Sequence, residues 1–369
     1  MRRHSIVGLV LFALAFTACQ PAQYQGLAGA TQNAPNITPG PLTNKVQYWD
    51  LGLSIKYPSN WEQPQFLASQ MTLAQSMQAA QGRSVTEPVV ALSTRNDSQL
   101  GLSKDATLQD IAAAISTGPG VTLSNQRTTS LAGLDAAFLD LKDDTNKLYG
   151  AVFAFRLPDG RLGSLISVAP FSEWADFAPT LDAMQQSVTL LKPSDFKVPA
   201  PGGSTATFPA GGLTFSLPEG WVSKSLGKNG TTLYGSSTDT DYLDNSGFAN
   251  GPQLVIIGQT LAQGQSIRSA MTAMIAGQSG DKITDIQVGD QVGTQILSSD
   301  AATGQVVNFI GVTSQDKRVL MVLRWTTPGI LSDVTLPMLG SILGSAKFGA
   351  ITSPIALPAA PVGMQAATH

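Results

Sequence analysis

Few side chains in this chain can act as an acid, a base or a nucleophile near neutral pH. The 369 residues include two histidines, His4 and His369, and one cysteine, Cys19. Residues 20–368 therefore lack the imidazole and thiol groups on which most nucleophile–base pairs depend. This excludes Ser-His-Asp and Cys-His catalysis, Cys/His zinc sites and internal disulfides from that stretch.

Carboxylates are the remaining candidates for chemistry. Asp239, Asp241 and Asp244 lie close together in STDTDYLDNSG, with Asn245 alongside. Such oxygen ligands suit calcium, but their spacing differs from the calcium-loop template D-x-[DN]-x-[DN]-G. We favour a solvated loop here and keep a calcium site as the alternative. The sequence selects no acid pair for glycoside hydrolysis and no other metal or cofactor site.

One polar cluster could form a surface site. Lys142, Asp143, Asp144 and Lys147 form a polar cluster that indicates a hairpin turn at the surface. Its composition gives no reason to expect more than a turn.

Aromatic residues offer candidate binding surfaces. Trp61 and Trp221 recur at equivalent places, which favours a core role over ligand stacking. Phe171, Trp174 and Phe177 lie near the start of an expected helix. We expect them to pack on a sheet, with an exposed patch for a protein partner as the alternative.

The charge pattern excludes one class of partner. Charged residues make up 13% of the chain, against roughly 25% in an average soluble domain. The formal net charge is −3, and no run of Lys or Arg exceeds two residues. Nucleic-acid binding needs a basic footprint, so we expect no nucleic-acid partner.

The N-terminal residues look like an export signal. A short basic start precedes an apolar run at residues 6–16, which is too short to span a membrane. Phe16-Thr17-Ala18-Cys19 resembles a bacterial lipobox, although Phe16 stands where Leu is more usual. That resemblance implies removal of a signal peptide, residues 1–18, and lipidation of Cys19, which would anchor the chain to a membrane. The alternative is an ordinary secretory signal with an incidental cysteine.

The sequence after Cys19 is typical of a tether. Residues 20–43 carry no charge and are rich in Pro, Gly, Ala and Gln, so we expect a flexible segment at 19–43. Residues 350–369 are similar and indicate a disordered tail. Gln20 stands where Asp often marks inner-membrane retention, which favours an outer membrane or the cell surface.

One unit occurs twice in the remaining chain. DLGLSIKYPSNW at 50–61 and AGGLTFSLPEGW at 210–221 match at an offset of 160 residues. In both, apolar residues alternate before a proline, which predicts a half-buried strand. We expect domains at 44–192 and 205–349, joined by a proline-bearing linker at 193–204.

The same order of elements follows in each copy. We predict strands at 89–93, 121–130, 134–141, 148–157 and 162–168, and at 254–258, 283–288, 291–298, 305–313 and 318–324. We predict helices at 107–116 and 173–191, and at 266–276 and 330–346, with one further amphipathic helix at 65–81 in the first copy. The short connections indicate antiparallel hairpins, so the fold class is α+β with helices covering an antiparallel sheet.

The repeated motif GLSIKYPSNW, recurring as GLTFSLPEGW, resembles the start of PsbP-like domains. The resemblance covers both copies and implies two tandem α/β/α sandwich domains. It implies accessory, scaffold or binding roles rather than catalysis, and it carries over no functional residue.

Three functions remain open on the sequence. The first is a non-catalytic, membrane-anchored lipoprotein of the cell envelope that binds or assembles a protein partner. The second is a solute-binding lipoprotein with a ligand between its domains. The third is a hydrolase that uses carboxylates alone.

Overall fold

The structure, a computed structural model, describes residues 40–67, 70–82, 86–116, 120–225, 232–235, 251–274, 282–300 and 304–351. Contacts divide the chain into two compact units, Met1–Leu191 and Lys192–His369. We call them unit 1 and unit 2 and describe each by itself.

Unit 1 contains two antiparallel sheets. The larger has seven strands in the order β3-β4-β5-β9-β8-β7-β6, and the smaller has three in the order β1-β2-β10. The strands are β1 (Asn44–Tyr48), β2 (Leu53–Tyr57), β3 (Gln65–Leu67), β4 (Gln70–Ala74), β5 (Val89–Arg95), β6 (Val121–Leu131), β7 (Leu134–Asp143), β8 (Leu148–Arg156), β9 (Leu162–Pro170) and β10 (Thr189–Leu190). Its helices are α2 (Met77–Ala80), α3 (Leu108–Ile115) and α4 (Trp174–Gln186), with short 3-10 turns at Asp97–Leu100 and, at the start of unit 2, Pro193–Asp195.

Unit 2 repeats this plan strand for strand. Its larger sheet has the order β13-β14-β15-β19-β18-β17-β16, and its smaller sheet has the order β11-β12-β20. The strands are β11 (Thr205–Phe208), β12 (Leu213–Ser216), β13 (Val222–Ser225), β14 (Thr232–Gly235), β15 (Gln253–Thr260), β16 (Lys282–Val288), β17 (Gln291–Asp300), β18 (Gln305–Thr313), β19 (Val319–Pro328) and β20 (Lys347–Phe348). The helices are α6 (Ile267–Met274) and α7 (Ser332–Gly344), with 3-10 turns at Pro209–Gly211 and Gly329–Leu331.

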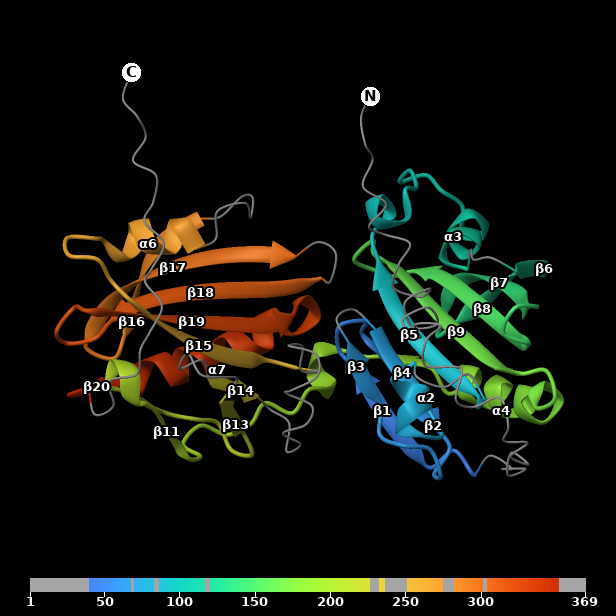
Figure 1. Cartoon of the computed structure of the whole chain (residues 1–369), viewed down its shortest axis with the longest axis horizontal. Helices are drawn as coiled ribbons and strands as arrows, with labels where there is room; N and C mark the ends of the chain where they lie inside the picture. Colours follow the sequence, from blue (N-terminus) through green and yellow to red (C-terminus); the bar gives the residue numbers. More distant parts are fainter. Residues whose placement is uncertain are drawn as a thin grey trace, which may run out of the picture. The chain divides into compact units, whose positions relative to one another are not determined.

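Helices cover the larger sheet in each unit (Figure 1). In unit 1, α3 contacts β7 and β8, while α4 contacts β9 and β2. In unit 2, α6 contacts β17 and β18, while α7 contacts β16, β19 and β12. Each unit is thus an α+β sandwich built on an antiparallel sheet, as the element order predicts. None of the helices that the structure describes is long and apolar enough to cross a membrane.

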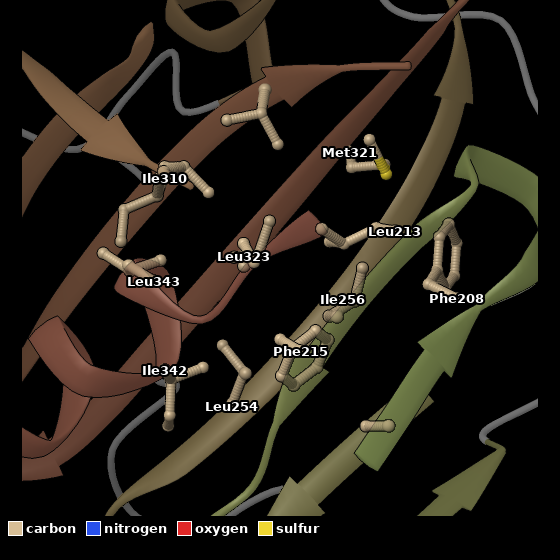
Figure 2. Packing of buried hydrophobic residues seen from close by; sticks show 14 of the residues in the cluster. Phe208, Leu213, Phe215, Leu254, Ile256, Ile310, Met321, Leu323, Ile342 and Leu343 are labelled. Atoms are coloured by element: carbon tan, nitrogen blue, oxygen red, sulfur yellow. The ribbon is translucent and has the colours of Figure 1, made fainter. Parts of the chain in front are cut away.

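Strand β19 shows how the core of unit 2 is divided. Leu320 and Val322 pack with Ala270 and Met271 of α6, whereas Met321, Leu323 and Trp325 pack with the buried side of α7. Successive side chains of a strand point to opposite faces, so α6 and α7 lie on opposite faces of the sheet. Figure 2 shows the α7 side of this core, where Ile342 and Leu343 meet side chains from the small sheet such as Phe215.

Most of the predicted elements are confirmed, but the helix at 65–81 is wrong. Those residues form β3 and β4, and only Met77–Ala80 is helical. All five residues of β4 are buried, because β4 pairs with β5 inside the sheet. A run covered on both faces carries no strand alternation, and here we mistook its apolar spacing for a helical face.

This correction also removes the supposed insertion in the first copy. Unit 2 has β13 and β14 at the places that β3 and β4 occupy in unit 1. We did not predict β13 or β14, because each has four residues and carries too little sequence for a periodic pattern.

The repeated Gly-Leu motif has a conformational reason. Gly52 and Gly212 both have φ of +65°, a left-handed backbone that glycine adopts without steric cost. A Cβ at Gly212 would meet the Gly349 carbonyl. The glycine therefore turns the chain into the second strand of each small sheet.

A serine after the last long helix fastens it to the small sheet in both units. The Ser187 hydroxyl accepts from the Lys56 amide at 2.9 Å and donates to the Met184 carbonyl at 2.6 Å. In unit 2 the Ser345 hydroxyl accepts from the Ser216 amide and donates to the Ile342 carbonyl, each at 2.8 Å. The same two serine hydrogen bonds therefore occur in both units.

Ser345→Ala is expected to destabilise unit 2 by about 1–2 kcal/mol, because it leaves the part-buried Ser216 amide without its partner. Ser187→Ala is expected to destabilise unit 1 less, because the Lys56 amide is exposed and water can replace the hydroxyl. Urea unfolding followed by circular dichroism measures the change. Thr272→Ala removes an exposed hydroxyl that bonds only within its helix, and it serves as the control. Serine variants as stable as the control would contradict the role given to these hydroxyls.

Candidate functional site

A pocket of about 360 Å³ lies within unit 2. One wall is the segment 198–202, Val-Pro-Ala-Pro-Gly, and the facing wall is α7. The side chains of Leu217, Met338 and Ile342 are nearly fully buried and form an apolar base. Pockets of this size and character commonly hold small ligands, so this is the candidate site.

Two local features shape the pocket. The segment 200–204 pairs with the chain just after β12, since the Gly203 amide donates to Leu217 and the Glu219 amide donates to Ala200, at 2.8 and 2.9 Å. The facing wall is one side of α7. It carries Pro337, Ser341 and the helix-ending Ser345, which are spaced by four residues and therefore face the same way.

The walls carry no charged side chain. The Ser341 hydroxyl donates to the Pro337 carbonyl at 3.1 Å, and the Ser345 hydroxyl and the Ser216 amide are both engaged as described above. Prolines contribute no N–H donor. Of the three serine hydroxyls in the walls, only that of Ser216 makes no hydrogen bond within the described part of the chain.

Sequence reasoning missed this pocket. We read residues 193–204 as a linker, whereas contacts assign them to unit 2 and the second half of the stretch pairs with residues 217–219. One signal was available, because Pro39-Gly40-Pro41 and Pro199-Ala200-Pro201 stand at the same offset of 160 residues as the Trp motifs. Because the prolines recur at the offset of the repeated unit, they indicate that residues 199–201 belong to the folded unit and not to a linker.

Trp61 and Trp221 lie in the cores of their units, with 7% and 5% of their surface exposed. The Trp61 ring stacks on Phe177 at 6.1 Å between centroids, and the Trp221 ring stacks on Trp325 at 5.8 Å. The Trp221 indole nitrogen is buried and has no hydrogen-bond partner among the residues that the structure describes. Neither tryptophan offers a surface for stacking a ligand.

The other aromatic candidates are split. Phe177 is buried, and Trp174 packs edge-on against it at 6.1 Å. Phe171 lies instead against Tyr149, 4.2 Å between centroids. The structure therefore does not bring Phe171, Trp174 and Phe177 together as one exposed patch.

The polar cluster at 142–147 forms a turn. The Asp143 carboxylate is buried and accepts from the Thr145 and Asn146 amides at 2.9 and 3.0 Å. Lys142 pairs with Asp144 at 2.8 Å on the surface, and this hydrogen bond lowers the pKa of the Asp144 carboxyl. These contacts close the β7–β8 hairpin, and the Lys142 ammonium also lies over the Phe171 ring, 5.8 Å from its centroid.

Two of the sequence candidates fall outside the described residues. They are Cys19 and the calcium candidate made by Asp239, Asp241 and Asp244. Within the described residues, no group of three or more His, Cys, Asp or Glu side chains could hold a metal ion.

Unit 1 contains a buried polar cluster that unit 2 lacks. Tyr48 and Asp50 are 2% and 3% exposed, and Arg161 donates to the Asp50 carbonyl at 2.6 Å. Burial, followed by the Asp50 carboxylate, raises the pKa of Tyr48, and burial lowers the pKa of Arg95 nearby. Phe208 and Ala210 stand at the equivalent positions of Tyr48 and Asp50 in unit 2. The cluster ties the β1–β2 turn to the larger sheet and lines no pocket among those described.

Known proteins resemble parts of this chain in structure only. No family model matches the sequence, and no curated protein matches it. The solution structure of cyanobacterial PsbP from Synechocystis aligns over 44% of this chain and 98% of its own, with 13% identity and a TM-score of 0.31.

Two other solved structures align over similar lengths. LpqN of Mycobacterium tuberculosis, described as involved in cell envelope biogenesis, covers 40% of this chain and 90% of its own, with 15% identity and a TM-score of 0.29. The Saccharomyces cerevisiae Ran-binding protein Mog1p covers 42% of this chain and 98% of its own, with 10% identity and a TM-score of 0.28. We carry no activity or partner over from them.

Proposed function

We propose that this chain is a non-catalytic binding module of the cell envelope, anchored to a membrane through a lipid on Cys19. The observation that carries the binding role is the pocket of unit 2, an apolar cavity without a charged group. The observation that supports anchoring is the lipobox-like Phe16-Thr17-Ala18-Cys19 after an apolar run of eleven residues.

The distribution of reactive residues favours binding over catalysis. No histidine or cysteine occurs between residues 20 and 368, and none is among the residues that line the pocket. The pocket walls also lack an acid that could protonate a leaving group or a base that could activate water. The segment 20–43 would then serve as the tether between the lipid and unit 1.

The N-terminal peptide of the mature protein tests the anchor directly. We expect mass spectrometry of protein extracted from bacterial membranes to find a chain that begins at Cys19 and carries acyl groups. A mature chain that begins elsewhere, or an unmodified Cys19, would refute the anchoring half of the proposal.

The binding half has its own test. Crosslinking in intact cells, followed by purification of the full chain, is expected to recover the same envelope protein in repeated experiments. Recovery of no reproducible partner would count against an assembly role and would leave a small ligand as the object of binding.

A further inference from the structure

We propose that the pocket of unit 2 binds a small uncharged aliphatic molecule with one hydroxyl group, such as a medium-chain alcohol. The inference rests on the proposed binding function and deepens it by naming the class of ligand. Three features of the pocket support it: its volume, the hydrogen bonds that already occupy several of its polar groups, and the absence of charge in its walls.

The volume sets the size of the ligand. A space of about 360 Å³ holds about a dozen groups of the size of a water molecule, at roughly 30 Å³ each in the liquid. That is one short chain and is too small for a whole membrane lipid. A free small molecule therefore fits better than a lipid embedded in a bilayer.

Several polar groups of the walls are already hydrogen-bonded within the protein. The Ser341 and Ser345 hydroxyls donate to carbonyls of their own helix end, and the Ser216 amide donates to Ser345. The amides of Gly203 and Leu217 are taken up in the pairing of the two chain segments. Water in a cavity needs two to four polar partners, so an apolar chain displaces it readily.

One polar group remains for the ligand. Ser216 is one of the residues that line the pocket, and its hydroxyl makes no hydrogen bond within the described residues. It provides one anchor for a hydroxyl at the end of an aliphatic chain. A carboxylate or an ammonium would lose its hydration without gaining an opposite charge, so charged ligands are disfavoured.

The test uses the full chain with Cys19→Ala in detergent-free buffer, so that neither detergent nor the attached lipid competes. The uncharged fluorescent probe N-phenyl-1-naphthylamine is expected to bind saturably, and 1-decanol is expected to displace it. Decanoate, at the same pH, is expected to displace it much less.

A matched pair of variants places the binding in this pocket. Ser341→Trp fills the cavity from an exposed helix position and is expected to weaken decanol binding about tenfold or more. Gly340→Trp adds the same side chain to the neighbouring residue, where a Cβ meets nothing within 4 Å. That variant is expected to leave binding unchanged.

A second pair of variants places a negative charge, instead of a bulky ring, at the same two positions. Ser341→Asp is expected to weaken decanol binding, whereas Gly340→Asp is not, and urea unfolding of all four variants shows that each is folded. Absence of saturable displacement, equal effects within either pair, or tighter binding of decanoate than decanol would overturn the proposal. The lipid on Cys19 and the crosslinked partner are measured in separate experiments. A failure of the proposed function can therefore be told apart from a failure of ligand binding in the pocket.

Discussion

Cys19→Ala is expected to move most of the protein from the membrane fraction to the soluble fraction, or to block its processing. Each buried methylene of an acyl chain contributes about 0.8 kcal/mol of membrane affinity, so two or three chains hold a protein almost permanently. None of the described helices could replace them as a span. Loss of the acyl chains should therefore release nearly all of the protein from the membrane.

Fractionation of cells followed by immunoblotting measures this redistribution. Gln20→Ala changes the neighbouring residue, keeps the thiol and serves as the control, which is expected to stay with the membranes. If Cys19→Ala is processed and still sediments with membranes as the unchanged protein does, the anchor lies elsewhere.

Trp61→Ala and Trp221→Ala are each expected to destabilise their own unit by about 3–5 kcal/mol. Both rings are nearly buried, and each stacks on a second aromatic ring, Phe177 in unit 1 and Trp325 in unit 2. Truncation removes the stacking and leaves a cavity that the surrounding strands and helix fill only in part. A loss of this size approaches the whole stability of an ordinary domain.

Urea unfolding followed by circular dichroism, resolved into one transition for each unit, measures the effect. Trp221→Phe keeps a ring and removes a buried indole N–H that has no partner in the described part of the chain, so it is expected to destabilise less than Trp221→Ala. Trp174→Ala, at a half-buried position, is the control for unit 1. If either core variant unfolds at the urea concentration of the unchanged protein, the stacked pair does not support that unit.

The fold could be predicted where the sequence carries long patterns. Strands β6 to β9 and their counterparts β16 to β19 have seven to eleven residues each and are joined by short turns. Thr107 and Ser266, the first residues of two predicted helices, cap them by accepting from the amides of Asp110 and Ser269 at 3.1 Å. Such local signals do not depend on the rest of the fold.

Other parts of the fold depend on partners that are distant in the sequence. β4 is a strand because β5 pairs with it, and β10 and β20 have two residues each, which form strands only through β2 and β12. The pocket also depends on residues that are distant in the sequence. Residues 198–202 have the composition of a linker and become a wall only by pairing with residues 217–219.

The small sheet has a mechanical consequence for a chain that is pulled at its two ends. Strand β1 enters beside Tyr57, at one end of β2, whereas β10 leaves beside Leu53, at the other end. A pull between the two ends of the unit therefore runs along the strands in opposite directions and loads their hydrogen bonds in shear. Antiparallel bonds lie across the strands, so they must break together instead of unzipping one by one. The pairing of β11 and β20 with β12 repeats this geometry, so tension along the chain loads the small sheet of unit 2 in shear as well.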